Sequence, residues 1–269
     1  MIGKATNISE ARKRAERAAE KLFLPVTLPI YSADEKRPDQ IGTATLISVG
    51  GTRFLLTAAH VLDECEDAGM FAGADGQFVP ISGRASITSK VAGKREDDHF
   101  DIAVIPLEGE LETSLAGIAA VDEKSIDWKP GPTSGHLFSA FGFPNTRNKI
   151  TERSSTKVKP EALQHTDRIV DDPTSAKRLP DGGTHHLHLG YGRRANDADD
   201  NAQNAIKPRG MSGGPLIDLG KLSDPEVLEG RASTVPKLVA IVTERGVGLN
   251  LVCTKMSVVR KVLEDAGRL

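Results

Sequence analysis

The sequence predicts an all-β protein with one helix at each end of the chain. From about Gly42 to Val242 the apolar residues come in short runs, separated by glycines and polar turn residues. Many short strands between turns are typical of β-barrels or β-sandwiches, whereas α/β proteins alternate strands with long helical segments. The two ends of the chain differ, because their apolar residues recur at helical spacing.

The N-terminal segment is expected to form a helix that begins near Ser9. Ser9 can act as its N-cap, and the residues at helical spacing are Ala11, Ala15, Ala18, Ala19 and Leu22. We expect this helix to pack on the surface of the body, and docking of a partner on it is the alternative. Pro25, Pro29 and Pro38 are expected to break regular structure after it.

A tight hairpin is predicted around Gly50-Gly51, because Thr43–Val49 and Thr52–Thr57 have the pattern of strands on either side. The further strands expected along the chain are Gln77–Ile81, Ala85–Val91, Asp101–Leu107, His136–Gly142, His185–Tyr191, Gly214–Leu219 and Leu238–Val242. Apart from the strand after His185, the stretch from Asn145 to about Arg209 is expected to be a long irregular segment, and loops of this length are usually functional or partly disordered.

The chain is expected to end in a helix for which Ser257 can be the N-cap. The apolar face of this helix consists of Val258, Val259, Val262 and Leu263. A helix with one such face is expected to dock on the body as the last element of the fold.

Length, charge and cysteine content restrict the class of protein. The 269 residues suffice for one large domain or two small ones. The 35 basic and 37 acidic residues give a net charge of −2, so a globally basic surface for nucleic acid is not expected. No signal-peptide or membrane-spanning pattern is found. Cys65 and Cys253 are the two cysteines, and they are expected to be inert free thiols in a reducing compartment. Together with the lack of a membrane-spanning pattern, this favours a cytoplasmic protein with no membrane partner.

Three polar residues carry the strongest chemical signal. Ser212 lies among glycines in Gly210-Met211-Ser212-Gly213-Gly214, His60 follows the apolar strand that ends at Thr57, and Asp101 precedes another apolar run. A nucleophile, a base and an acid that orients the base are the parts that acyl transfer requires. Backbone N–H groups of Gly210 and Ser212 can form an oxyanion hole. Asp97 and Asp98 compete with Asp101 for its role.

The order of these residues excludes one alternative. Gly210-x-Ser212-x-Gly214 also matches the nucleophile elbow of α/β-hydrolases, in which the histidine follows the serine. The last histidine of this chain is His188, before Ser212. The order His60, Asp101, Ser212 therefore favours a chymotrypsin-type architecture.

Metal and cofactor sites are not expected. His185, His186 and His188 suggest a zinc site, but no cysteine or further histidine lies at ligand spacing nearby. The acidic run 197–200 lacks the glycine and terminal glutamate of a calcium loop. We expect a structural strand and a solvated loop, and no cofactor.

Three motifs, found in the segment Gly42–Met256, resemble those of trypsin-like (chymotrypsin-family) serine peptidases of the bacterial intracellular type. Thr57-Ala58-Ala59-His60 is similar to the histidine motif of that family, Asp101-Ile102-Ala103-Val104 to its aspartate motif, and Gly210 to Pro215 to its serine motif. The resemblance implies two antiparallel six-stranded β-barrels with the triad in the cleft between them. The segments expected are an N-terminal helix and linker at 1–40, a first barrel at 41–125, a second barrel at 126–256 and a C-terminal helix at 257–269.

Departures from the family pattern bear on activation and specificity. Met211 stands where secreted relatives have the aspartate that pairs with a new N-terminus, so activation by zymogen cleavage is not expected. Ile206, six residues before the nucleophile, is not acidic, which argues against a preference for Lys or Arg. By resemblance Thr243, Arg245 and Leu251 line the substrate site. A small or apolar P1 residue is expected, with an acidic P1 facing Arg245 as the alternative.

The sequence thus predicts a serine endopeptidase that acts on protein or peptide substrates through His60, Asp101 and Ser212. Two alternatives remain open. In one, the barrels form a catalytically silent scaffold that binds a peptide or partner protein. In the other, an activating partner orders the serine loop and switches the enzyme on.

Overall fold

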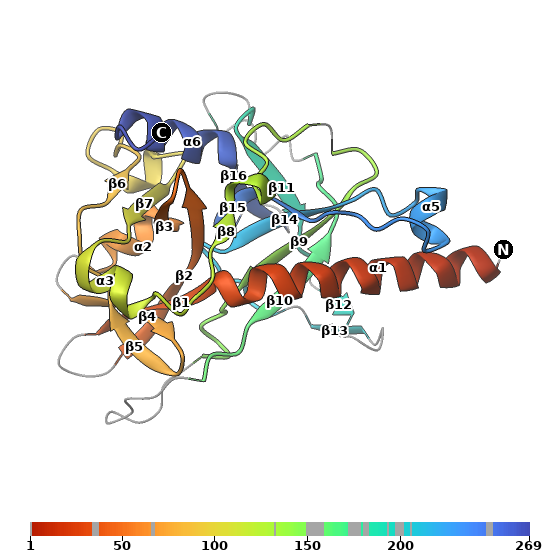
Figure 1. Ribbon diagram of the computed structural model, residues 1–269, viewed down its shortest axis with the longest axis horizontal. Helices are drawn as coiled ribbons and strands as arrows, with labels where there is room; N and C mark the ends of the chain where they lie inside the picture. The colour runs from red at the N-terminus through yellow and green to blue at the C-terminus, as the bar shows by residue number, and fades with distance from the viewer. Residues whose placement is uncertain are drawn as a thin grey trace.

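The computed structural model describes residues 2–33, 38–65, 68–131, 133–148, 159–171, 179, 183–192, 194–196, 202–204, 206–245 and 250–269. Two mainly antiparallel sheets form the body, with a long helix lying along one side and a shorter one at the C-terminus (Figure 1). The predicted class, mainly β with a helix at each end, is confirmed.

The first sheet has eight strands in the order β5-β4-β1-β2-β3-β7-β6, with β8 parallel to β2. The strands are β1 (Thr27–Ala33), β2 (Pro38–Val49), β3 (Thr52–Ala58), β4 (Gly69–Ala74), β5 (Gln77–Pro80), β6 (Ser86–Ile87), β7 (Ile102–Pro106) and β8 (Val121–Asp122). The helical turns within this half are η1 (Leu24–Val26), α2 (Ala59–Asp63), η2 (Arg95–Asp97), α3 (Gly109–Ser114) and η3 (Glu123–Ser125).

The second sheet has six strands in the order β10-β9-β14-β15-β16-β11. They are β9 (Leu137–Gly142), β10 (Leu163–Asp167), β11 (His186–Gly190), β14 (Pro215–Gly220), β15 (Lys237–Arg245) and β16 (Asn250–Lys255). The short pair β12 (Arg194–Asn196) and β13 (Ala202–Asn204) lies apart from it, and the remaining helices are α1 (Ile2–Phe23), α5 (Pro225–Leu228) and α6 (Met256–Asp265).

The strand count of six holds for the second sheet and not for the first. The first sheet has eight strands because the two-residue strands β6 and β8 pair with β7 and β2. Such short pairings leave no period of two in the sequence that could predict them. The expectation of two six-stranded barrels is therefore corrected to an eight-stranded and a six-stranded sheet.

The strand β1 contradicts the prediction that the prolines end regular structure after the first helix. Pro29 lies within β1, opposite Thr43 of β2. Pairing of β1 with β4 begins only at Ile30, so Pro29 lies where the strand has a single neighbour and a missing N–H is tolerated. The prediction of an irregular segment after Asn145 was also wrong at β10, whereas the acidic run 197–200 lies outside the described residues.

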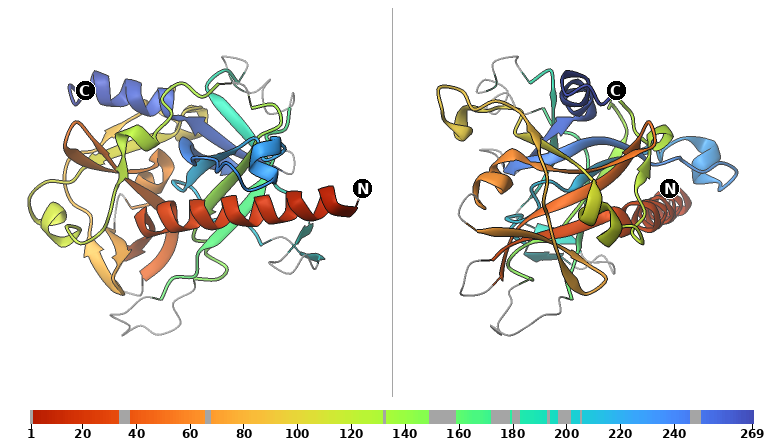
Figure 2. Two further views of the ribbon diagram at one scale, coloured as in Figure 1. Left: turned by 45° about the vertical axis from the view of Figure 1, so that its right-hand side comes forward. Right: turned by 60° about the vertical axis from the view of Figure 1, so that its left-hand side comes forward.

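Both terminal helices begin earlier than their predicted caps. α1 begins at Ile2 and α6 at Met256, so Ser9 and Ser257 lie inside the helices. A serine caps a helix only where the residues before it leave helical geometry, and neither segment contains a proline to force that. As predicted, α1 lies along the body (Figure 2), where its buried side chains are Ala11, Ala15, Ala19 and Phe23.

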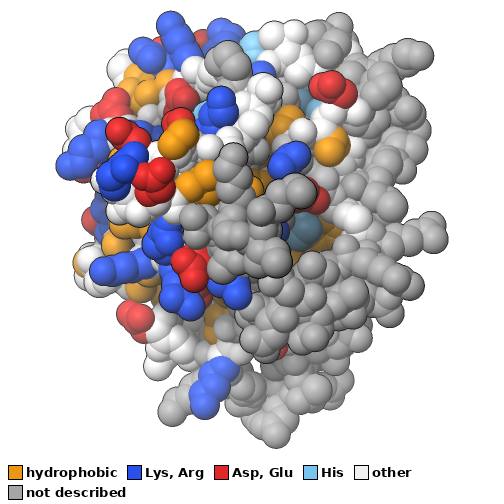
Figure 3. Space-filling view, turned by 90° about the vertical axis from the view of Figure 1, so that its right-hand side faces the viewer, with side chains coloured by type: hydrophobic (Ala, Val, Ile, Leu, Met, Phe, Trp, Pro, Cys, Tyr) orange, Lys and Arg blue, Asp and Glu red, His pale blue; other side chains and the backbone are white. Residues whose placement is uncertain are grey.

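The predicted hairpin is confirmed, with Val49 opposite Thr52 and positive φ angles at Gly50 and Gly51, 55° and 81°. One apolar cluster includes Leu46 and Leu56 of the first sheet and Ile217 and Ile241 of the second, which packs the two sheets into one body. On the face in Figure 3, the described Lys and Arg side chains are interspersed with Asp and Glu. Within the described residues, no helix is long and apolar enough to cross a membrane.

Candidate active site

His60 and Asp101 meet because their strands are neighbours. β3 leads into α2, which carries His60, and Asp101 comes directly before β7. In the antiparallel β3–β7 pair Ala58 lies opposite Ile102, so the two residues emerge at the same end of the pair. His60 Nδ1 lies 2.5 Å from Asp101 Oδ2, and the His60 backbone N–H donates to Asp101 Oδ1 at 2.8 Å.

Asp101 is held in an uncommon conformation and a buried environment. Its φ angle is 51°, in the left-handed region that few residues other than glycine adopt. Burial raises the pKa of Asp101, while hydrogen bonds from His60 oppose that rise. A carboxylate that accepts from Nδ1–H fixes the imidazole tautomer in which Nε2 carries the lone pair that a base requires.

The serine loop is bound to both sheets. Thr43 of β2 donates its N–H to the Ser212 carbonyl at 2.8 Å, and the Gly213 N–H donates to the Val242 carbonyl of β15 at 2.7 Å. The Thr45 hydroxyl donates to the Gly213 carbonyl at 3.0 Å. The backbone of Ser212 and Gly213 is therefore fixed at the junction of the two sheets.

Two side chains of β2 fix the peptide next to the candidate oxyanion hole. The Gly210 carbonyl accepts from the Thr43 hydroxyl at 2.7 Å and from Gln40 Nε2 at 3.2 Å. Gly210 has a φ of 97°, and a Cβ there would lie 2.6 Å from Gln40 Oε1 and 2.7 Å from the Phe143 carbonyl. Only glycine fits this backbone. Within the described chain, the N–H groups of Gly210 and Ser212 have no acceptor.

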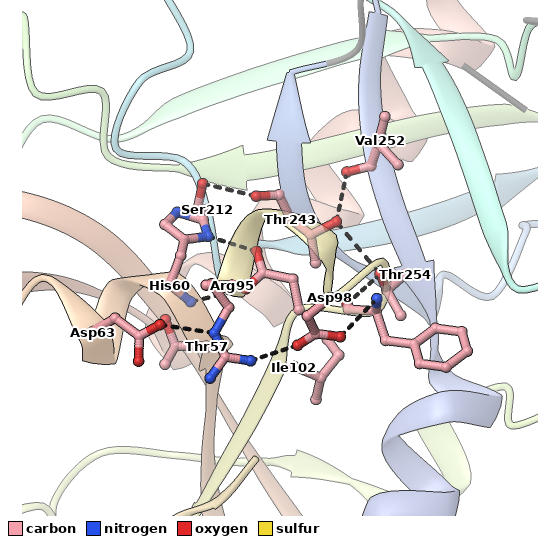
Figure 4. A network of polar contacts seen from close by, with 12 residues as sticks. Thr57, His60, Asp63, Arg95, Asp98, Ile102, Ser212, Thr243, Val252 and Thr254 are labelled. Carbon is pink, nitrogen blue, oxygen red and sulfur yellow. Dashed lines mark hydrogen bonds and ion pairs between the residues drawn. The ribbon is translucent and has the colours of Figure 1, made fainter. Parts of the chain in front are cut away.

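The Ser212 hydroxyl is directed at the second sheet. Its Oγ donates to the Thr243 carbonyl at 3.1 Å, the contact marked in Figure 4. The Thr243 hydroxyl donates in turn to the Val252 carbonyl of β16 at 3.3 Å. A serine hydroxyl has one proton, so it is not donated to the imidazole while Thr243 accepts it.

Comparison with known proteins identifies the family. The family of trypsin-like peptidase domains matches this chain over residues 42–221. The chain belongs to the trypsin-like peptidase family. A search of curated proteins found no match.

Solved structures of other proteins share the fold of this chain. A serine endoprotease from Yersinia pestis matches with a TM-score of 0.53 and 15% identity, over 93% of this chain and 65% of that one. An HtrA-type protease, AlgW, solved with a tripeptide, matches with a TM-score of 0.52 and 15% identity, over 94% and 65%. At this identity the likeness shows the chymotrypsin-like fold alone. The chain spans 65% of the length of each of these two proteins.

The candidate specificity residues of this chain lie on the second sheet and beside it. Leu251 is buried in β16 and is the register partner of Arg245 at the end of β15. Ile206 is held by its carbonyl, which accepts from the Tyr191 hydroxyl. The side chain of Arg245 lies outside what the structure describes, so its contact with an acidic P1 residue stays a prediction.

The histidine cluster has a structural partner in the turn before β7. His186 Nε2 lies 2.8 Å from the His99 carbonyl, and the His186 ring stacks on Phe100 at 6.0 Å between centroids. These contacts fix the residues just before Asp101. Among the described residues there is no group of three His, Cys, Asp or Glu that could hold a metal ion.

Two residues near the site were not singled out from the sequence. Gln40 contacts Gly210 of the serine loop, which is far from it in sequence. Arg95 contacts Asp63 at the end of α2, the helix that carries His60. Gln40 leaves no signal in the sequence, because it lies beside Asp39 in a strand with several other polar residues. Arg95 leaves none beyond the acidic residues after it. Asp98, the competitor of Asp101, pairs with Arg95 at 2.5 Å instead of with the imidazole.

Proposed function

We propose that this trypsin-like peptidase domain is a serine endopeptidase, with Ser212 as nucleophile, His60 as general base and acid, and Asp101 as the residue that orients His60. Membership of the family implies protein or peptide substrates. The observation that carries the proposal is the contact of 2.5 Å between His60 Nδ1 and Asp101 Oδ2, next to a serine loop anchored on both sheets.

In the first step the Ser212 Oγ attacks the carbonyl carbon of the scissile peptide bond. His60 Nε2 takes the hydroxyl proton, and the carbonyl electron pair moves to oxygen. The N–H groups of Gly210 and Ser212 donate to this oxyanion. Loss of one such donor typically lowers the rate by about 10²–10³.

The intermediate collapses when the C–N bond breaks and the imidazolium gives its proton to the leaving amine. The acyl group then remains as an ester on Ser212. A water molecule repeats the attack with His60 as base, the ester bond breaks, and Oγ recovers its proton as the carboxylic acid leaves. No cofactor takes part in these steps.

The contact between Ser212 and Thr243 supports a second candidate, an enzyme switched on by its substrate or by a partner. The hydroxyl must exchange the Thr243 carbonyl for His60 Nε2 before attack. A neutral hydrogen bond contributes about 1 kcal/mol, so a modest binding energy suffices for this exchange. A silent scaffold would be the outcome if no condition released the hydroxyl.

The substrate site is proposed to take a small or apolar P1 residue. Leu251 and the buried strand β16 supply an apolar wall, and Ile206 offers no acidic group for a basic side chain. Cleavage of a peptide library varied at P1 tests this, and preference for Asp or Glu would favour the alternative, in which Arg245 reads the substrate.

We propose a reducing, cytoplasmic location for the protein, because its two cysteines do not form a disulfide. Cys65 and Cys253 are both free and buried, and burial raises the pKa of each thiol. Free thiols persist where the compartment keeps them reduced.

The experiment that tests the function is labelling of the purified protein with a fluorophosphonate, followed by mass mapping of the adduct. Ser212→Ala is the control, and it should lower kcat by about 10⁶ while leaving the fold intact. Labelling at Ser212 supports a preassembled enzyme. Labelling only with a partner or peptide supports the switched enzyme, and turnover retained in Ser212→Ala contradicts the proposal.

A further inference from the structure

Arg95 lies between the element that carries His60 and the turn that carries Asp101. Its Nε is 2.8 Å from Asp63 Oδ2, and Asp63 is the last residue of α2. Its Nη1 is 2.5 Å from Asp98 Oδ2 and donates to the Thr88 carbonyl at 2.8 Å. Figure 4 shows the guanidinium between the two carboxylates. The Arg95 side chain is 11% exposed, so water competes little for these contacts.

Asp98, which is held by Arg95, in turn fixes the backbone on both sides of Asp101. Its carboxylate is 3% exposed and accepts from the Phe100 N–H at 3.2 Å and from the Thr88 hydroxyl at 2.5 Å. The same hydroxyl oxygen accepts from the Ile102 N–H at 3.0 Å. Left-handed geometry is unfavourable at a residue such as Asp101 and persists only where the surrounding structure holds it.

Asp63 connects Arg95 to His60, because both the acidic residue and the histidine belong to the short helix α2. The two residues are three apart on α2, which has five residues and no side-chain cap. A single helical turn is unstable by itself, so its orientation depends on contacts with the rest of the protein. The ion pair with Arg95 is one such contact, and Lys90 Nζ lies 3.4 Å from the other Asp63 oxygen.

We propose that Arg95 is a positioning residue, whose guanidinium ties α2 to the turn before β7 and so sets the His60–Asp101 contact. The rigid planar fork of arginine suits this role, because one side chain contacts two carboxylates from different elements. This inference rests on the proposed function for its effect on turnover, but not for its effect on the His60–Asp101 geometry.

A matched control variant can distinguish a positioning role of Arg95 from a general contribution to the stability of the fold. Arg53 has similar exposure, 16%, and its guanidinium also contacts a carboxylate, Glu112, and two carbonyls. These partners are on α3 or follow it, and none belongs to α2 or to the turn before β7. Arg53→Met therefore removes a comparable set of contacts without touching α2 or the Asp101 turn.

The test compares Arg95→Met with Arg53→Met by the saturating rate and the half-saturating concentration of fluorophosphonate labelling at Ser212. A displacement of about 1 Å in a catalytic group can cost about 10²-fold in rate. We expect Arg95→Met to lower the saturating rate by about that factor, with little change in the half-saturating concentration. Equal rates in the two variants would overturn the proposal.

A second pair keeps the test valid if Arg95→Met does not fold. Arg95→Lys keeps the charge but lacks the fork, and it is compared with Arg53→Lys. We expect a loss of about 10-fold in the saturating rate for Arg95→Lys alone. Retention of the full rate would contradict a role for the fork.

A readout that needs no hydrolysis separates this inference from the proposed function. The His60 Nδ1–H proton, held by Asp101, should give a downfield NMR signal that is absent in His60→Ala. We expect the signal to persist in Arg53→Met and to broaden or disappear in Arg95→Met. If the wild type does not label with or without a peptide or partner, but the signal behaves in this way, the function fails and the positioning role stands. An unchanged signal in Arg95→Met would refute the role itself.

Discussion

Gly213 is the residue of the serine loop that packs most closely against the backbone of β2. The variant Gly213→Ala therefore tests whether this close packing holds the loop in place. The φ of Gly213 is 92°, and a Cβ there would lie 1.8 Å from the Thr43 carbonyl oxygen and 2.5 Å from the Thr57 hydroxyl. The first of these contacts must lengthen from 1.8 Å to at least 3.0 Å. The atom in the way belongs to the backbone of β2, so no side-chain rotation relieves the overlap.

The cost follows from the contacts that such a shift breaks. Left-handed geometry at an alanine costs about 1–2 kcal/mol. Three hydrogen bonds meet at this point, from Thr43 N–H to Ser212, from Gly213 N–H to Val242, and from the Thr57 hydroxyl to Thr43. At about 1 kcal/mol each, their loss brings the total to about 4–5 kcal/mol, a large part of the stability of a typical domain.

The assay is urea unfolding of Gly213→Ala beside Gly50→Ala. Gly50 also has a positive φ, 55°, but a Cβ added there would have no atom within 4 Å. Gly50→Ala should therefore cost only the backbone contribution of about 1–2 kcal/mol. Fluorophosphonate labelling at Ser212 should be lost in Gly213→Ala and kept in Gly50→Ala. Equal unfolding free energies for the two variants would refute the reasoning.

Two further predictions concern the residues around the site. Thr43→Val removes the hydroxyl that donates to Gly210 and accepts from Phe143 N–H at 3.0 Å, which should cost about 2–4 kcal/mol in urea unfolding and slow labelling. Thr43→Ser keeps the hydroxyl and should restore both the unfolding free energy and the labelling rate. Labelling of Thr43→Val at the full rate would contradict the role of this hydroxyl in holding the serine loop. For Asp63, burial alone would raise the pKa, but Arg95 and Lys90 hold the pKa below its ordinary value. Its carboxylate therefore adds stability above the unfolded pKa of about 3.9, and this contribution is lost as the pH falls through the folded pKa. The difference in unfolding free energy between wild type and Asp63→Asn should be full above about pH 4 and shrink below it, whereas a pH-independent difference would contradict the ion pair.

The fold was predictable where the pattern is local and strong. The Gly50-Gly51 hairpin follows from two glycines between strand patterns, and the C-terminal helix from its apolar face. The strand at Thr27–Ala33 was missed because Pro29 signals a break, and the missing N–H is tolerated only because of which strands flank it. Pairings of two residues, such as β8 with β2, have no sequence signal at all.

The candidate catalytic residues could be proposed from the sequence, but the contacts that hold them in place could not. His60, Asp101 and Ser212 each lie in a short motif of contiguous residues, so their chemistry can be inferred from sequence. The contacts that fix them join distant segments. Thr43 and Gly210 are 167 residues apart, and Gln40 and Gly210 are 170 apart.

The amino-acid order by itself determined the β class, the family motifs and the chain order that excludes an α/β-hydrolase. The tertiary structure alone decided that Arg95 joins α2 to the Asp101 turn, that β2 holds the serine loop, and that the Ser212 hydroxyl donates to Thr243. The physical reason is that propensities and motifs act over neighbouring residues. Hydrogen bonds and ion pairs between distant residues exist only after the fold has brought their elements together.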